Sequence, residues 1–159
     1  MDFGAEPHRV TGFGRSAGAH LFSMLAYGPE LSEGPHAQST RPNAFVNNVG
    51  VTDWSLFDPS VALGYYFGAQ YATIGDVPEH AKTSASAVYH ILNGGPQTPT
   101  LSLYTGPTHQ PPLSIEDGHD LTFGRVLHAA FAGGPHTLLT TGMSTPAADI
   151  VAWINAATP

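Results

Sequence analysis

The stretch Arg9 to Leu21, RVTGFGRSAGAHL, decides how the first part of this 159-residue chain folds. Residues 9–13 are rich in β-forming side chains, and they predict a short strand that ends at Gly14. Residues 17–28 follow with apolar side chains at helical spacing, and the Gly-Pro pair at the end of this run stops the helix. The sequence therefore predicts a strand that turns into a helix at Ser16.

The turn itself carries the motif GxSxG, written here as Gly14-Arg15-Ser16-Ala17-Gly18. Small residues suit both sides of the serine, because Cβ atoms there would collide with the neighbouring strand and helix in so sharp a turn. The turn would hold the Ser16 hydroxyl above the edge of the sheet. The free N–H groups of the helix start, that of Ala17 first, would face a developing oxyanion. This context predicts that Ser16 is a nucleophile, whereas the plainer interpretation is a glycine-rich strand–helix turn.

Alternating strand and helix patterns continue to the end of the chain. Further strands are predicted over 45–51, 100–104 and 137–141, and further helices over 116–131 and 146–157. Strands separated by helices pair in parallel through right-handed crossovers. We therefore expect an α/β fold over residues 1–159 as one domain, with a mainly parallel sheet of about four strands. Residues 53–98 are long and aromatic at their start, which suits either a lid or pocket wall or ordinary core and loop.

Composition narrows the function. Only 11% of the residues are charged, against about 25% in a typical protein, and acids outnumber bases 12 to 5. A net charge of −7 without a basic stripe argues against nucleic acid. No apolar run is long enough for a bilayer, so we expect a soluble chain with no membrane partner, and the cytoplasm is the favoured location. The chain has no cysteine, and its nine histidines include no HxxxH or HExxH pair, so we expect no metal and no cofactor.

The run Phe3 to Leu21, FGAEPHRVTGFGRSAGAHL, resembles the nucleophile region of carboxylesterase-like and feruloyl-esterase-like α/β-hydrolases. Three later stretches are similar to the strands and the helix that follow in that family, namely PNAFVNNVGVTDW, TPTLSLYTG and RVLHAAFAGGPHTLLTTG. The resemblance implies a truncated α/β-hydrolase, corresponding to the later strands of that fold. It also implies serine hydrolysis of a small-molecule carboxylic ester or lactone, with Ser16 as the nucleophile and the Ala17 N–H as an oxyanion donor.

The chain departs from this family at the other members of the catalytic triad. The family places its acid in a GxxD pattern after the third of these strands, where this chain reads Gly106-Pro107-Thr108-His109. The family's histidine follows the last strand, where this chain reads GMSTP over residues 142–146. The HGGG-type loop that supplies a second oxyanion donor has no counterpart either.

Other residues would have to complete the triad. His109 and Asp53 each follow a strand at the carboxyl edge expected to carry Ser16, so Ser16, His109 and Asp53 form a candidate rearranged triad. The plainer interpretations are a solvated loop for His109 and a helix N-cap for Asp53. The acidic cluster SIEDGHD, residues 114–120, is expected to begin a helix.

Two other functional classes stay open. The chain is either the serine hydrolase described above, a degenerate hydrolase fragment that serves as a binding or assembly module, or a metal-dependent hydrolase that uses His and Asp side chains. The strand at residues 9–13 would also lie at a sheet edge with few charges, which predicts a homo-oligomer through that edge unless residues 53–98 fold back over it.

Overall fold

A computed structural model describes residues 9–30, 39–115 and 120–158 of the chain. Four strands form one sheet, namely β1 (Thr11–Arg15), β2 (Ala44–Asn48), β3 (Thr100–Leu103) and β4 (His136–Leu139). They lie in sequence order and every neighbouring pair is parallel. The predicted α/β architecture with a parallel four-stranded sheet is therefore confirmed.

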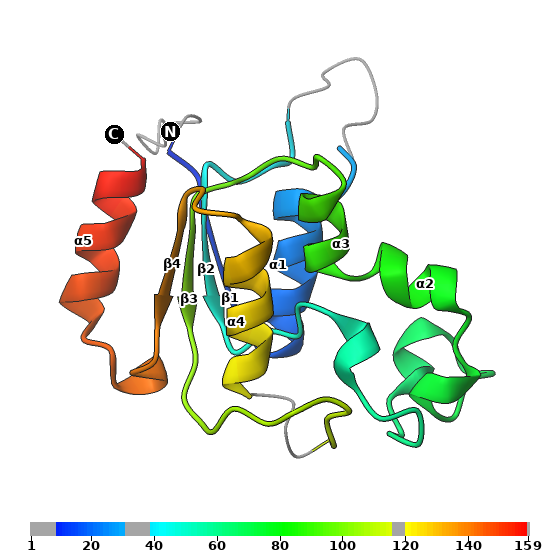
Figure 1. Ribbon diagram of the computed structural model, residues 1–159. Coiled ribbons are helices and arrows are strands. Elements are labelled where there is room, and N and C mark those ends of the chain that lie inside the picture. Colours follow the sequence, from blue (N-terminus) through cyan, green and yellow to red (C-terminus); the bar gives the residue numbers. More distant parts are fainter. Residues whose placement is uncertain (1–8, 31–38, 116–119, 159) are drawn as a thin grey trace.

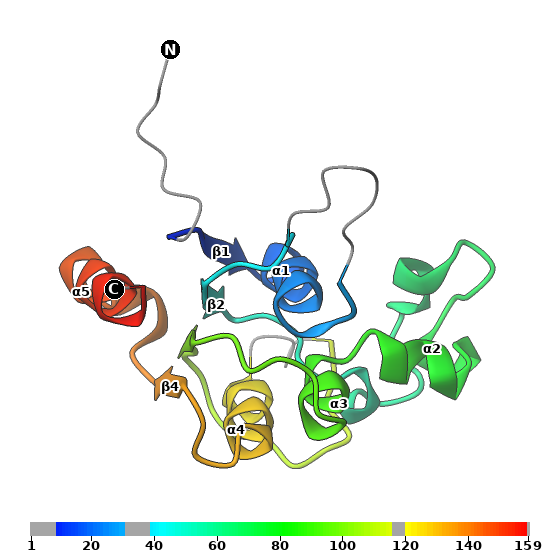
Figure 2. The same cartoon turned by 90° about the horizontal axis from the view of Figure 1, so that it is seen from above.

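The helices lie on both faces of this sheet (Figures 1 and 2). On one face lie α1 (Ala17–Tyr27), α3 (Ala87–Leu92) and α4 (Leu121–Ala130), while α5 (Ala147–Ala157) covers the other face. A short helix, α2 (Glu79–Ser84), precedes α3 at the side of the molecule. Four 3-10 turns complete the fold: η1 (Trp54–Leu56), η2 (Gly64–Phe67), η3 (Ile74–Asp76) and η4 (Gly142–Ser144). No helix in these described ranges has the length and apolar character needed to cross a membrane.

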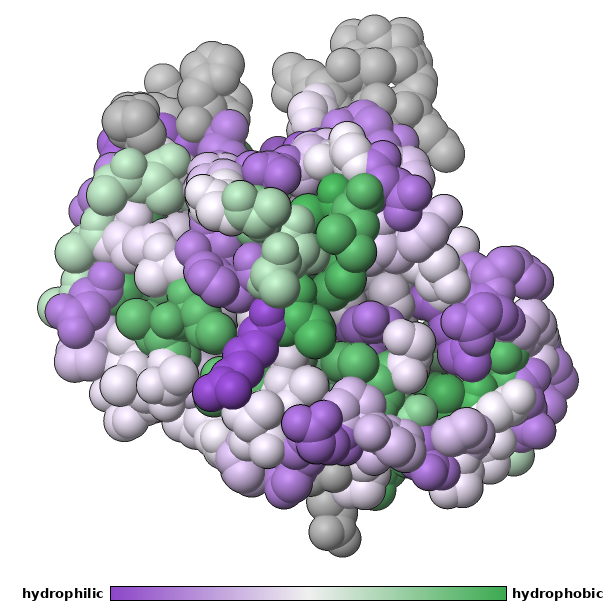
Figure 3. Space-filling model, in the orientation of Figure 1, coloured by the Kyte–Doolittle hydropathy of each residue, from purple (hydrophilic) through white to green (hydrophobic). Residues whose placement is uncertain are grey.

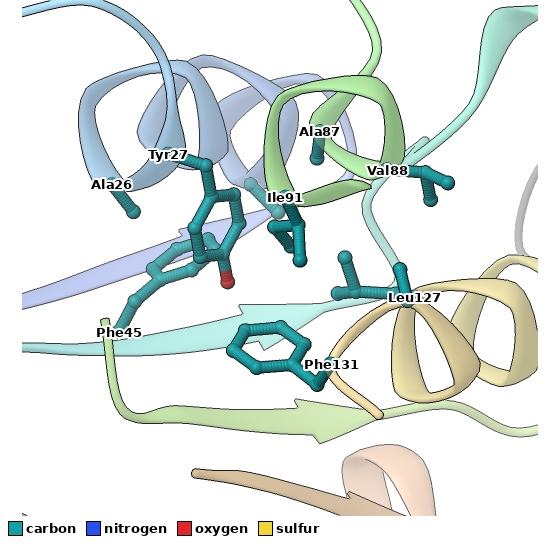
Figure 4. Close-up of a cluster of buried hydrophobic side chains, with 10 residues drawn as sticks. Ala26, Tyr27, Phe45, Ala87, Val88, Ile91, Leu127 and Phe131 are labelled. Carbon is teal, nitrogen blue, oxygen red and sulfur yellow. The ribbon is translucent and has the colours of Figure 1, made fainter. Parts of the chain in front are cut away.

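The main core lies between the sheet and the three helices on its first face. Tyr27 of α1 packs edge-on against Phe45 of β2 and Phe131 at the end of α4 (Figure 4). The buried Tyr27 hydroxyl shares a hydrogen bond of 2.5 Å with Thr100 Oγ1, so its polar atom is paired inside the core. On the opposite face, α5 packs Trp153 and its neighbours against Val46, Leu101 and Leu103.

The surface shown in Figure 3 carries a band of hydrophobic residues that runs down from the region of α3, between surfaces that are mainly hydrophilic. Tyr89 and Leu92 of α3 are among the exposed large apolar side chains. This pattern agrees with the low charge of the sequence, because a chain with few charged residues leaves apolar side chains on its surface.

Element boundaries differ from the prediction where the backbone turns early. The strand expected to run to residue 51 ends at Asn48, because Val49 has φ 51° and a strand cannot continue through a left-handed residue. The helix expected over 116–131 spans residues 121–130, and residues 116–119 lie outside the described ranges. Residues 53–98, predicted to be partly helical, contain three 3-10 turns and two short helices.

Candidate functional site

Ser16 lies between β1 and α1 with φ 51° and ψ −122°. An L-residue other than glycine rarely adopts such angles, and holding it there costs about 1–3 kcal/mol, so the surroundings must fix it. Two backbone bonds do so: Ser16 N donates to Asn48 O at 2.9 Å, and His20 N donates to Ser16 O at 3.0 Å. The strand–turn–helix predicted at GxSxG is therefore present, and it is strained at the serine.

The two glycines of the motif have different steric roles. A Cβ on Gly14 would lie 2.5 Å from Gly18 O and 2.6 Å from both Ala19 Cα and Ala19 N, which are all backbone atoms. A Cβ on Gly18 would meet no atom of the described residues within 4 Å. The expectation that both flanking positions are sterically restricted therefore holds for Gly14 and is wrong for Gly18 within the described part of the chain.

Ser16 lies on the wall of a cavity of about 250 Å³. The other lining residues are mostly apolar and come from α1, from the segment after β2 and from the loop after β3: Ala17, His20, Leu21, Val51, Trp54, Phe57, Leu63, Tyr66 and Ile115. Four of them lie within residues 53–98, the region for which the sequence suggests a lid or pocket wall. A reactive hydroxyl beside an apolar cavity is the arrangement expected for binding an apolar group next to a nucleophile.

Ala17 is the first residue of α1 and is exposed at the wall of this cavity. Its N–H belongs to the first turn of the helix, which has no intrahelical acceptor. The positive end of the helix dipole adds to the attraction for an anion at this point. Ala17 N–H therefore lies at the helix start beside the cavity, and its role as an oxyanion donor stays a prediction.

His20 lies four residues after Ser16, on the same side of α1, and is half-buried in the cavity wall. Its Nε2 lies 2.8 Å from Ala85 O and 3.0 Å from Trp54 Nε1. The bond to Ala85 O requires a proton on Nε2, because a carbonyl only accepts, whereas the bond from Trp54 requires a lone pair on Nε2, because an indole N–H only donates. Only one of the two bonds can therefore form at a time. Burial lowers the pKa of His20, an effect that the bond to Ala85 O opposes.

Asp53 lies at the start of η1, just beyond the end of β2. Its Oδ1 accepts from Ser55 N at 2.9 Å and from Ser55 Oγ at 2.7 Å. These bonds cap the 3-10 turn, which is the plainer interpretation of this residue. The local Asp-x-Ser turn satisfies this oxygen, and the structure pairs His109 with a different acid.

That acid is Asp120, the N-cap residue of α4. His109 Nδ1 lies 2.5 Å from Asp120 Oδ2, and the side chain of Asp120 is 1% exposed while that of His109 is 48% exposed. Asp120 Oδ1 also accepts from Thr122 N at 2.6 Å. The cluster SIEDGHD does lead into a helix through Asp120, whereas Asp117 and His119 lie outside the described residues.

The sequence predictions did not pair Asp120 with His109 and did not place His20 in the cavity wall, whereas Trp54 lies in the region expected to form a lid or pocket wall. A usable pattern existed for His20, because positions four apart share a helix face and Ser16 immediately precedes the helix. Asp120 was treated only as part of a helix start. Its contact with His109 depends on how the loop after β3 returns to α4, and no spacing rule predicts the path of that loop. His136 is the first residue of β4 and lies at the amino edge of the sheet.

Metal binding finds no support in the arrangement of side chains. Within residues 9–30, 39–115 and 120–158, no group of three or more His, Asp or Glu side chains lies close enough together to hold a metal ion. His128 Nδ1 and His136 Nδ1 lie 2.8 Å apart at the start of β4, but they form only a pair.

Neither a family model nor a curated protein matches the chain. Several solved structures do resemble it. The truncated form of a carbohydrate esterase from gut microbiota aligns with a TM-score of 0.69 and 13% identity, over 99% of this chain and 62% of that one. An esterase from Thermogutta terrifontis, Est2 with bound propionate, aligns with a TM-score of 0.54 and 19% identity, over 96% and 55%. Prolyl oligopeptidase B from Galerina marginata aligns with a TM-score of 0.58 and 22% identity, over 97% and 21%.

These proteins have the α/β-hydrolase fold, and the resemblance that the sequence indicated is confirmed at the level of fold. The chain spans less than two thirds of the length of each of them. The four strands and their helices therefore form a part of that fold.

Proposed function

Starting from this partial α/β-hydrolase fold, we propose that the chain carries the nucleophile of a serine hydrolase that cleaves carboxylic esters or lactones. One observation carries the proposal, namely that Ser16 is held at φ 51° on a strand–helix turn and lines an apolar cavity. Strain of this kind persists only where the surrounding structure imposes it, and it is concentrated at functional sites.

In the proposed reaction, Ser16 Oγ forms a bond to the carbonyl carbon of the ester while its proton passes to a histidine. The carbonyl π electrons move to the oxygen, which becomes an oxyanion beside Ala17 N–H. The C–O bond to the alcohol then breaks and the alcohol takes the proton from the histidine. Water hydrolyses the acyl-enzyme by the same steps. With a lactone the alcohol stays attached to the acyl group, and the product is a hydroxy acid.

His109 is the histidine that we assign to this proton transfer. It follows β3, and because the strands are parallel, β3 ends at the same edge of the sheet as β1, which carries Ser16 (Figure 1). His109 is half exposed and its Nδ1 is bonded to a carboxylate. A histidine held by a carboxylate at one ring nitrogen acts as a base through the other, and here that other atom is Nε2.

The cavity limits the apolar group of the substrate. An apolar protein cavity of about 150 Å³ holds benzene. The cavity beside Ser16, at about 250 Å³, therefore accepts a group somewhat larger than one six-membered ring. Apolar contacts from Trp54 and Phe57 would bind such a group, and none of the described residues that line the cavity is an acid, a lysine or an arginine.

Covalent labelling tests the nucleophile directly. An organophosphonate reacts with an activated serine, so the intact protein should gain the mass of one phosphonyl group, located at Ser16 by peptide mapping. Ser16→Ala should gain none. Ser23 is buried in α1 and is a suitable site for a second control, because Ser23→Ala should be labelled like the wild type. A wild-type adduct at another serine, or an adduct that survives Ser16→Ala, would contradict the assignment.

A binding or assembly module is the second candidate, and the exposed apolar side chains of Val10 and Phe13 at the β1 edge of the sheet favour it. A folded protein without any phosphonate adduct would favour this function.

A further inference from the structure

We propose that Asp120 is the residue that positions His109 for proton transfer, in the role that the sequence suggested for Asp53. This inference rests on the proposed serine hydrolase function. It adds to that function the carboxylate that orients the base, which neither the family pattern nor the sequence spacing supplies.

The contact with the ring comes first. Asp120 Oδ2 lies 2.5 Å from His109 Nδ1, which is short for a hydrogen bond between nitrogen and oxygen. A hydrogen bond that a carboxylate accepts is stronger than one between neutral groups. The carboxylate is buried, with 1% of its side chain exposed, while 48% of the imidazole is exposed. The acid is thus the fixed partner and the ring is the partner that faces outward.

The backbone of His109 is held by the same helix start. His109 N donates to Asp120 Oδ2 at 3.1 Å, and His109 O accepts from Thr122 Oγ1 at 2.9 Å. Leu121 N donates to Pro107 O at 3.2 Å. The loop after β3 is therefore attached to the first turn of α4 at both sides of His109, so ring and backbone are fixed together.

The side chain of Asp120 is itself held in one position, because both of its oxygens accept hydrogen bonds. Oδ1 accepts from Thr122 N at 2.6 Å and caps α4, while Oδ2 accepts from the ring of His109, and His109 N donates to both oxygens, at 3.1 Å to Oδ2 and 3.4 Å to Oδ1. A cap bond of this type stabilises the helix and fixes the carboxylate relative to the helix axis. A side chain with this degree of fixation can hold an imidazole in one orientation.

The chemical consequence concerns the ring tautomer. A carboxylate can only accept a hydrogen bond, so the proton of the neutral imidazole lies on Nδ1. The lone pair is then on Nε2, the atom that takes the Ser16 proton in the proposed reaction. An amide in place of the carboxylate would present an N–H to Nδ1 or lose the bond to the backbone, and the wrong tautomer would be favoured.

Asp53 offers a matched comparison, since it too follows a strand and caps a helical turn by accepting from the N–H two residues on. Asp53→Asn and Asp120→Asn are the same chemical change at two similar caps, and Asn is as good a cap as Asp. Both variants are therefore expected to fold. Only the change at Asp120 removes a contact with a histidine.

The experiment compares wild type, Asp120→Asn and Asp53→Asn in hydrolysis of p-nitrophenyl acetate and in the rate of phosphonate labelling of Ser16. Asp120→Asn should lower kcat by about 10³- to 10⁴-fold, as expected for loss of the carboxylate that sets the tautomer, with a smaller change in KM. Asp53→Asn should stay within about threefold of wild type. Equal kcat for Asp120→Asn and wild type would overturn the proposal, as would a larger loss for Asp53→Asn.

A spectroscopic readout keeps the test independent of turnover. The imidazole ¹⁵N resonances of His109, assigned by their loss in His109→Gln, should show a protonated Nδ1 and a bare Nε2 for the neutral ring in the wild type. The Nε2-protonated tautomer should gain population in Asp120→Asn. A wild-type ring already protonated at Nε2 would overturn the role of Asp120. If the wild type shows the Nδ1 tautomer but no Ser16 adduct and no hydrolysis, the positioning of His109 stands and the serine hydrolase function fails.

Discussion

Gly14→Ala should lower the rate of ester hydrolysis although it replaces no atom of Ser16 or Ala17. The new Cβ would lie 2.5 Å from Gly18 O and 2.6 Å from Ala19 N, whereas ordinary contact begins at 3.4 Å. The nearest gap must therefore open by 3.4 − 2.5 = 0.9 Å. All three close atoms are backbone atoms of α1, so no side chain can rotate away and the start of the helix itself must move.

The size of the effect follows from this displacement. The start of α1 carries both the Ser16 hydroxyl and the Ala17 N–H, and a misplacement of about 1 Å costs about 100-fold in rate. Overpacking of this kind also destabilises a protein by about 1–3 kcal/mol. We expect kcat for ester hydrolysis to fall about 100-fold in Gly14→Ala, together with a lower Tm.

Gly18→Ala is the matched control, since it makes the same change at the other glycine of the motif. Its Cβ meets none of the described atoms within 4 Å, and alanine in a helix is more favourable than glycine by about 0.5–1 kcal/mol. The test measures kcat for ester hydrolysis and the Tm of both variants. If Gly14→Ala keeps wild-type kcat, or if Gly18→Ala loses as much, the steric account of the turn is refuted.

Three further predictions concern other parts of the molecule. Burial and, to a smaller extent, the nearby His128 lower the pKa of His136 to about 3. Between pH 6.5 and pH 3 the unfolded chain therefore binds a proton at His136 that the folded chain does not bind. The free energy of unfolding falls as the pH drops through this window. The loss is at most about 5 kcal/mol, and urea unfolding at pH 7 and pH 4 should show a smaller difference in His136→Gln than in the wild type. Trp54→Ala should enlarge the cavity and shift preference from acetyl toward longer acyl esters, which the ratio of kcat/KM for acetate and octanoate esters measures, and an unchanged ratio would place the acyl group elsewhere. The strand β1 lies at the sheet edge with Val10 and Phe13 exposed, so light scattering at tens of micromolar should give a mass above 16.7 kDa, and a clean monomer would exclude stable pairing through this edge.

Periodicity and turn residues were sufficient to predict most of the fold from the sequence. The strand–turn–helix at Ser16 needs only local information, because the glycines, the serine and the apolar spacing of α1 are contiguous. The strand after Pro42 is less well predicted at its end. Val49 is a strong β-former, yet it adopts φ 51° because its N–H is bonded to Leu103 O and the following turn is held by buried side chains. Those long-range contacts override local preference.

The candidate site shows the same division. The positions of Ser16 and Ala17 at the strand–helix turn could be predicted from the motif alone, because both depend on that one turn. His109 was chosen for its position after a strand, and the carboxylate beside it was assigned to Asp53 by the same rule. In the structure, the loop after His109 folds back so that Asp120, eleven residues further along the chain, contacts the imidazole, while Asp53 is bonded to Ser55. A rule based on strand ends cannot predict this, because the partner comes from a helix start.

The central claim is that Ser16 is the nucleophile of an ester hydrolase. Its most direct test is the hydrolysis of short-chain p-nitrophenyl esters by wild type and Ser16→Ala side by side, at equal protein concentration and with folding of both checked by circular dichroism. The account predicts turnover by the wild type and a loss of at least 1,000-fold in kcat for Ser16→Ala, in the range of about 10⁴ to 10⁶ known for removal of a serine nucleophile or its partners. Near wild-type turnover by Ser16→Ala would contradict it.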